Sequence, residues 1–184
     1  MARGLAGTRV AFLVANEGVE QVELTDPWQA VEQAGARPTL LAPRAGQVQA
    51  FHGLDRAARF PVQQRVADAR VADFDELLLP GGVANSDRLR TDLRAVAFVR
   101  DFADAGKPVA AISHAPWTLI EADVVRGTRL TSWPSLRTDL RNAGAQWADE
   151  EVVVDPEHGY LLVTSRGPAD LPAFGRETVR ALGR

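Results

Sequence analysis

The chain has 184 residues, of which 46% are hydrophobic and 24% charged, and its formal net charge is −3. This balance is typical of a soluble globular domain, and the acidic excess argues against a protein that binds nucleic acid through its charge. The absence of cysteine excludes disulfides, thiolate zinc sites, iron–sulfur clusters and a cysteine nucleophile. No segment approaches the roughly 20 apolar residues of a membrane helix. Residues 1–8 lack the apolar stretch of a secretory signal, so we expect a cytoplasmic protein without a membrane partner.

Short apolar runs alternate along the chain with longer amphipathic stretches, a pattern that predicts strands alternating with helices. The predicted strands are 10–14, 39–42, 77–79, 108–112, 152–154 and 160–164, and the predicted helices are 19–34, 92–105, 115–121, 135–142 and 170–182. Residues 43–72 are less regular, and we expect a hairpin or an excursion there. The alternation predicts one α/β domain over residues 1–184, with a doubly wound parallel sheet that binds ligands at the carboxyl ends of its strands.

Three strands end in unusual sequences, at residues 16–24, 79–87 and 111–117. In a doubly wound sheet these three segments converge on one edge. The third is the most informative, because a buried strand leads through Ser113 directly into a helix. Two interpretations of Ser113 are open. It is either a nucleophile on a strand–turn–helix elbow or a plain helix N-cap, and the residue type alone favours the cap.

The other candidate residues near these strand ends also have two interpretations each. Gly81 and Gly82 either aim backbone N–H groups at an oxyanion or simply form a turn. Glu20 and Glu23 are either catalytic carboxylates or acidic residues in the first turn of a helix, where the dipole favours them. His114 is either a catalyst or a structural histidine. His52, His114 and His158 are far apart in sequence, so we expect no metal site.

Taken together, the three segments resemble the PfpI intracellular-protease family, within the ThiJ/PfpI and class-I glutamine-amidotransferase-like superfamily. Further stretches that carry the resemblance are 131–135, 142–145 and 164–171. The resemblance covers nearly the whole chain from Val10 to the C-terminal helix. It implies a flavodoxin-like three-layer sandwich, a homodimer or hexamer, and an enzyme that needs no cofactor.

When the family's motifs are matched to this sequence, the resemblance assigns the nucleophile to Ser113, where the family usually has cysteine. It assigns the adjacent histidine to His114. It assigns the carboxylate that hydrogen-bonds the nucleophile to Glu20. The oxyanion donors become the backbone amides of Gly82 and His114, and the acidic partner of the histidine becomes Asp87. Two smaller departures are serine at position 86 in place of the usual proline and alanine at position 115 in place of the commoner glycine.

The implied activity is attack on a carbonyl, in a stress-response enzyme of the intracellular-protease, glyoxalase III or deglycase type. We expect a small carbonyl or a peptide as substrate, with the small carbonyl favoured, and no nucleic acid. A serine hydroxyl does not ionise as a thiol does, so we expect a weakened or inactive site. Serine at 113 is either natural or a replacement of cysteine, and the intact residues around it favour replacement. Two alternative functions are a redox sensor with chaperone-like action, which needs the missing cysteine, and a binding module with a dead site.

Overall fold

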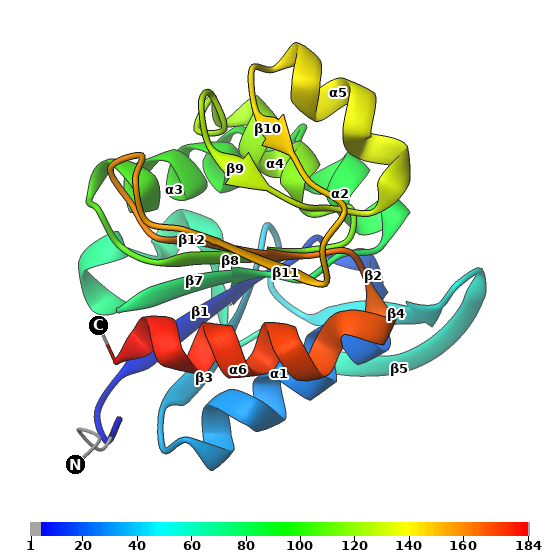
Figure 1. The fold of residues 1–184 in the computed structure, drawn as a ribbon. Helices are drawn as coiled ribbons and strands as arrows, with labels where there is room; N and C mark the ends of the chain where they lie inside the picture. The colour runs from blue at the N-terminus through cyan, green and yellow to red at the C-terminus, as the bar shows by residue number, and fades with distance from the viewer. Residues whose placement is uncertain (1–4, 184) are drawn as a thin grey trace.

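The computed structural model describes residues 5–183, and its centre is a seven-stranded sheet (Figure 1). The strand order is β11-β12-β8-β7-β1-β3-β6. The strands are β1 (Arg9–Leu13), β3 (Arg37–Ala42), β6 (Gln64–Arg65), β7 (Glu76–Leu79), β8 (Val109–Ile112), β11 (Val152–Asp155) and β12 (Leu162–Ser165). All neighbours pair in parallel except β11 and β12, which are antiparallel. The inner strands are apolar throughout because helices cover both faces of the sheet.

Two groups of helices form the outer layers of this sandwich. On one face, α1 (Gln21–Gln33) and α6 (Leu171–Leu182) lie side by side, as the blue and red helices in Figure 1 show. The opposite face carries α2 (Val83–Leu89), α3 (Leu93–Asp104), α4 (Pro116–Glu121) and α5 (Arg137–Asn142). Alternate residues of β1 serve the two cores: Phe12 packs with the α1/α6 layer, and Leu13 with the α3/α4 layer. The predicted three-layer α/β sandwich with a mainly parallel sheet is confirmed.

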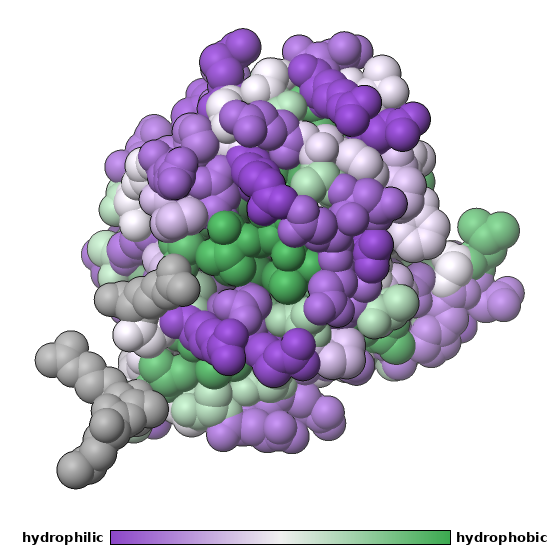
Figure 2. Space-filling model, viewed as in Figure 1, coloured by the Kyte–Doolittle hydropathy of each residue, from purple (hydrophilic) through white to green (hydrophobic). Residues whose placement is uncertain are grey.

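A separate three-stranded sheet projects from one end of the sandwich. It contains β2 (Glu17–Glu20), β4 (Gln47–His52) and β5 (Asp55–Pro61), of which β4 and β5 form an antiparallel hairpin. The hairpin lies within the irregular region where one was expected. Figure 2 shows hydrophobic atoms at its far end, where Leu54 is 97% exposed.

Several element bounds differ from the sequence-based expectation. The predicted helix 19–34 begins at Gln21, because residues 17–20 pair with β4 as a strand instead. The short helix α2 and the two-stranded sheet of β9 (Arg129–Leu130) and β10 (Gln146–Trp147) were not predicted. These elements are short, and pairing with distant residues decides them. Within residues 5–183, no helix has the length and apolar character needed to cross a membrane.

Candidate active site

The ends of β1, β7 and β8 meet at one edge of the central sheet, because the three strands are parallel neighbours. The segments that follow these strands contain the candidate catalytic and oxyanion residues: Glu20, Glu23, Gly81, Gly82, Asp87, Ser113 and His114. The expected convergence of the three segments is therefore present.

Ser113 lies on a sharp turn between β8 and α4. Its φ of 62° is a left-handed conformation, which costs a residue other than glycine about 1–3 kcal/mol. The turn is held on both sides, since Ser113 N donates to Ser165 O at 3.0 Å and Trp133 N donates to Ser113 O at 2.8 Å. The N-cap of α4 is Ala115, so the interpretation of Ser113 as a simple cap is wrong. Ser113 occupies the elbow geometry expected of a nucleophile.

Glu23 is the acidic side chain that lies against Ser113. It is only 1% exposed on the first turn of α1. Burial, helped by the charge of Glu20, raises its pKa to about 8, and the Ser113 side chain and Gly81 backbone offset this in part. Its Oε2 atom has no well-formed hydrogen bond within residues 5–183. The carboxyl is therefore protonated at neutral pH and can donate a proton at the site.

Glu20, which the resemblance assigned as the partner of the nucleophile, turns to the hairpin instead. Its Oε2 atom accepts a hydrogen bond from Gly53 N at 2.9 Å, and its Oε1 atom lies 3.7 Å from His52 Nδ1. The assignment failed because Glu20 is the last residue of β2, whereas Glu23 is in the first turn of α1 and faces inward. The sequence contained both glutamates three residues apart, and only burial distinguishes them.

His114 stands directly beside the candidate nucleophile. Its Nδ1 atom lies 3.2 Å from Ser113 Oγ. The ring stacks on Trp133, with centroids 5.7 Å apart, and meets Trp117 edge-on at 5.5 Å. Burial lowers the pKa of His114, so its ring is neutral near neutral pH and can accept a proton.

Asp87, the expected acidic partner of His114, lies at the rim of the same pocket and is exposed. Within residues 5–183 it forms no hydrogen bond or ion pair with His114. The structure thus brings Ser113, Glu23 and His114 together and leaves Asp87 apart from them.

The backbone amides that the resemblance assigned as oxyanion donors belong to Gly82 and His114, which line the same pocket as Ser113. Neither Gly82 N nor His114 N donates to another group in the described part of the chain, and both residues line the pocket. Gly82 has a φ of 96°, and a Cβ there would lie 2.3 Å from Gly18 O. Glycine is therefore required at 82, because any side chain there would collide with the backbone of β2.

Asn85 is a positioning residue that sequence reasoning did not identify. It is fully buried, accepts a hydrogen bond from Ala15 N at 2.7 Å, and donates to Pro80 O and Gly81 O, both at 3.0 Å. These bonds tie the loop after β1 to the loop after β7. An asparagine three residues after the Gly81-Gly82 pair was the only available signal.

The residues around Ser113 line a pocket of about 630 Å³, a volume suited to a small or medium-sized ligand. Its mouth carries three exposed hydrophobic side chains: Leu54, Val83 and Trp133. Glu17, Glu20, Asp87 and Arg88 supply the polar part of the wall.

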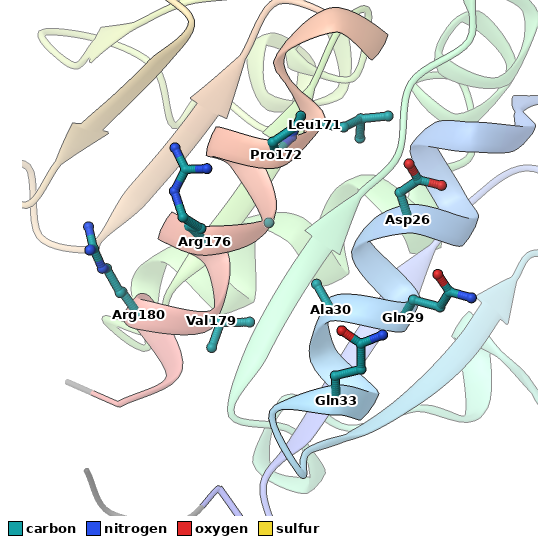
Figure 3. A pocket seen from close by; sticks show the side chains of 10 residues that line it. Asp26, Gln29, Ala30, Gln33, Leu171, Pro172, Arg176, Val179 and Arg180 are labelled. Carbon is teal, nitrogen blue, oxygen red and sulfur yellow. The ribbon is translucent and has the colours of Figure 1, made fainter. Parts of the chain in front are cut away.

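Another hollow lies between α1 and α6 and contains none of the residues at the strand ends (Figure 3). It is lined mainly by Gln29, Gln33, Leu171, Arg176 and Val179. No group of three or more His, Asp or Glu side chains with metal-binding geometry occurs within residues 5–183.

Comparison with known proteins agrees with this geometry. The model of the DJ-1/PfpI family matches residues 8–181. This chain belongs to the DJ-1/PfpI family. It is 43% identical over 175 residues to protein/nucleic acid deglycase 2 of Escherichia coli, covering 95% of this chain and 98% of that protein. It is 40% identical over 163 residues to general stress protein 18 of Bacillus subtilis, covering 89% of this chain and 91% of that protein.

Among solved structures, a two-domain protein from Anabaena variabilis, with DJ-1/ThiJ/PfpI-like and ferritin-like domains, superposes with a TM-score of 0.87 at 32% identity. The match covers 96% of this chain and 48% of that protein, so this chain spans about half of it. The family inferred from the spaced motifs is therefore confirmed, and so is the flavodoxin-like fold that it implied.

Proposed function

We propose that this DJ-1/PfpI protein is a cofactor-independent enzyme that processes reactive carbonyls or their adducts, as a deglycase or glyoxalase does. The observation that carries the proposal is the arrangement around Ser113. A strained elbow places its hydroxyl beside a protonated Glu23 and a neutral His114, in a pocket that Gly82 also lines. The names of the deglycase and stress-protein relatives support the same class of activity.

In the proposed reaction, Ser113 Oγ attacks the carbonyl carbon and its proton passes to His114 Nδ1, 3.2 Å away. The carbonyl π electrons move to the oxygen, where the amides of Gly82 and His114 stabilise the negative charge. Glu23 then donates its proton to that oxygen or to a leaving group. The site residues thus supply attack, proton acceptance, charge stabilisation and proton donation.

Serine makes this site weaker than cysteine would. A thiol beside this turn ionises readily, whereas a hydroxyl must lose its proton to His114 during the attack. Within the described chain, no acidic group orients or stabilises the His114 ring. We therefore expect low turnover from the chain as it stands.

The test compares this chain with Ser113→Cys on three substrates: methylglyoxal, a methylglyoxal adduct of N-acetyl-arginine, and a fluorogenic peptide. Ser135→Cys is the matched control, because it adds an exposed thiol outside the pocket. We expect Ser113→Cys to raise turnover of the first two substrates by orders of magnitude and Ser135→Cys to leave it unchanged. Equal gains in the two variants would refute the proposal. Turnover of the peptide alone would favour the protease interpretation instead.

We also propose that the chain assembles as a homodimer or hexamer. Three of the exposed large hydrophobic side chains surround the pocket mouth, where a second copy would cover them. Light scattering after size-exclusion chromatography measures the assembly directly, and a monomer at all concentrations would contradict it.

A further inference from the structure

The segment between β12 and α6, residues 166–170, lies beside the candidate active site. The residue before it, Ser165, accepts the hydrogen bond from Ser113 N through its carbonyl oxygen, at 3.0 Å. Pro168, within the segment, lines the pocket around Ser113. The segment therefore forms part of the wall of the site, and the contacts that hold the segment also hold that wall.

Gly167 brings the segment close to two groups of the site. A Cβ at this position would lie 3.0 Å from Cε3 and Cζ3 of Trp133 and 4.0 Å from Oε1 of Glu23. The φ of Gly167 is 170°, an extended conformation that any residue adopts. The glycine therefore serves close packing and not backbone freedom, because it lets the segment lie directly against the indole that stacks on His114.

Arg166 fastens the segment to the start of α6. Its Nε and Nη2 atoms donate to Asp170 Oδ2 and Oδ1, at 2.8 and 3.0 Å, and its backbone N–H donates to Oδ2 at 3.1 Å. The backbone N–H of Asp170 in turn donates to Gly167 O at 2.9 Å. Two parallel bonds from one guanidinium fix both its distance and its orientation. We call Arg166 and Asp170 the clamp.

The side chain of Asp170 serves the clamp instead of its own helix. Asp170 is the N-cap residue of α6, a position where aspartate usually accepts hydrogen bonds from the first amides of the helix. In the part of the chain that the structure describes, its carboxylate accepts none from α6. It is only 5% exposed, and a buried carboxylate is costly unless it is paired. Arg166 is therefore the partner that allows Asp170 to lie there.

The remaining partner of Arg166 is on the surface. Arg166 Nη1 donates to Asp149 Oδ1 at 2.8 Å, but the Asp149 side chain is 66% exposed. An exposed ion pair of this kind contributes little. Asp149 is also absent from the wall of the pocket around Ser113. It therefore offers a matched control, because it binds the same guanidinium without holding the segment to α6.

We infer that Arg166 is a positioning residue of the site. By holding Gly167 against Trp133, the clamp keeps the indole stacked on His114 and keeps Glu23 covered beside Ser113. Only its effect on turnover rests on the proposed function, since the stack exists without any substrate. Loosening the clamp should therefore change the proton affinity of His114, and not only the stability of the fold.

NMR of the chain as it stands tests the clamp without turnover. The His114 ring signal reports both its pKa and the ring current of the indole stacked on it. We expect Arg166→Gln to move the pKa upward toward 6.5, because burial lowers it in the parent, and to move the chemical shift toward that of an unstacked ring. Arg166→Lys keeps the charge and should restore part of the parent value. Asp149→Asn should match the parent.

Gly167→Ala keeps the inference testable if Arg166→Gln does not fold. The clamp stays intact in this variant, the extended φ suits alanine, and the new Cβ presses on Trp133. The His114 ring signal should therefore change while urea unfolding shows nearly the parent stability. The inference is overturned if neither variant moves the His114 signal, or if Asp149→Asn moves it as far as Arg166→Gln does.

Kinetics in the Ser113→Cys background extend the test to the reaction. With methylglyoxal, Arg166→Gln should lower kcat by about tenfold to a hundredfold and move the limb of the pH profile that follows His114 to higher pH. A loss of folded protein would lower the whole profile without moving it. A moved His114 signal without any turnover by Ser113→Cys would sink the proposed function but keep the clamp. Turnover by Ser113→Cys, with a His114 signal that no clamp variant moves, would do the reverse.

Discussion

Glu23 and Ser113 meet because the residue between them, Gly81, has no side chain. A Cβ at position 81 would lie 2.2 Å from Glu23 Oε2 and 2.7 Å from Ser113 Cβ. Real Cβ atoms do not approach other atoms this closely, so any larger residue would separate the acid from the candidate nucleophile. The glycine pair after β7 therefore has two functions: Gly81 makes room for this contact, and Gly82 presents an amide.

Gly81→Ala should therefore damage both stability and activity. We expect a loss of about 1–3 kcal/mol in the free energy of unfolding, as for other overpacked cores, and a loss of turnover in the Ser113→Cys background. Gly175→Ala on α6 is the control, because its Cβ would lie 3.4 Å from the nearest atom, Ala30 Cβ. Urea unfolding measures both variants, and equal stability for the two would contradict the close contact.

The raised pKa of Glu23 predicts a specific pH dependence of stability. An acid whose pKa is higher in the folded chain binds more protons there, so folding becomes less favourable as pH rises from about 4.5 to about 8. In Glu23→Gln, the free energy of unfolding should fall less over this pH range, by on the order of a few kcal/mol. Burial also raises the pKa of Glu76. Glu76 is present in both the parent chain and the Glu23→Gln variant, so its effect on the pH dependence of stability cancels when the two are compared.

The measurement is urea unfolding at several pH values between 4 and 9. Glu32→Gln, an exposed position on the same helix, should keep the pH profile of the parent chain. If the Glu23→Gln profile runs parallel to that of the parent, Glu23 is not a buried acid.

The stacking of His114 on Trp133 should control the titration of that histidine. NMR titration of the three histidine rings should show His114 titrating below its usual pKa of 6.5, because burial disfavours the charged ring. Trp133→Ala exposes the ring and should move its pKa upward, whereas Trp133→Phe keeps an aromatic cover and should move it less. Identical shifts in both variants would show that the aromatic cover does not matter.

Asn85 should be among the polar residues most costly to remove. Asn85→Ala leaves Ala15 N and the carbonyls of Pro80 and Gly81 without their partner in a buried place. We expect a loss of about 2–4 kcal/mol in the free energy of unfolding, from several unsatisfied groups. Asn142→Ala at the exposed end of α5 should cost less than about 0.5 kcal/mol. A small effect at Asn85 would show that water or loop movement replaces its bonds.

The sequence by itself determined the α/β layering, the edge of the sheet where the site lies, and the family. Apolar runs such as 10–14 and 108–112 are local signals, and the order of strands and helices follows from them. The spaced motifs then placed Ser113 and His114 at one strand end. These conclusions needed only neighbouring residues and their order.

Only the tertiary structure decided which carboxylate joins the nucleophile and whether Ser113 is a cap or an elbow. Glu20 and Glu23 look alike in sequence, and their roles separate because residues 17–20 pair with a strand some 30 residues away. The left-handed turn at Ser113 depends on hydrogen bonds to Trp133 and Ser165, which are distant in sequence. Each outcome rests on long-range pairing and burial, which no local pattern encodes.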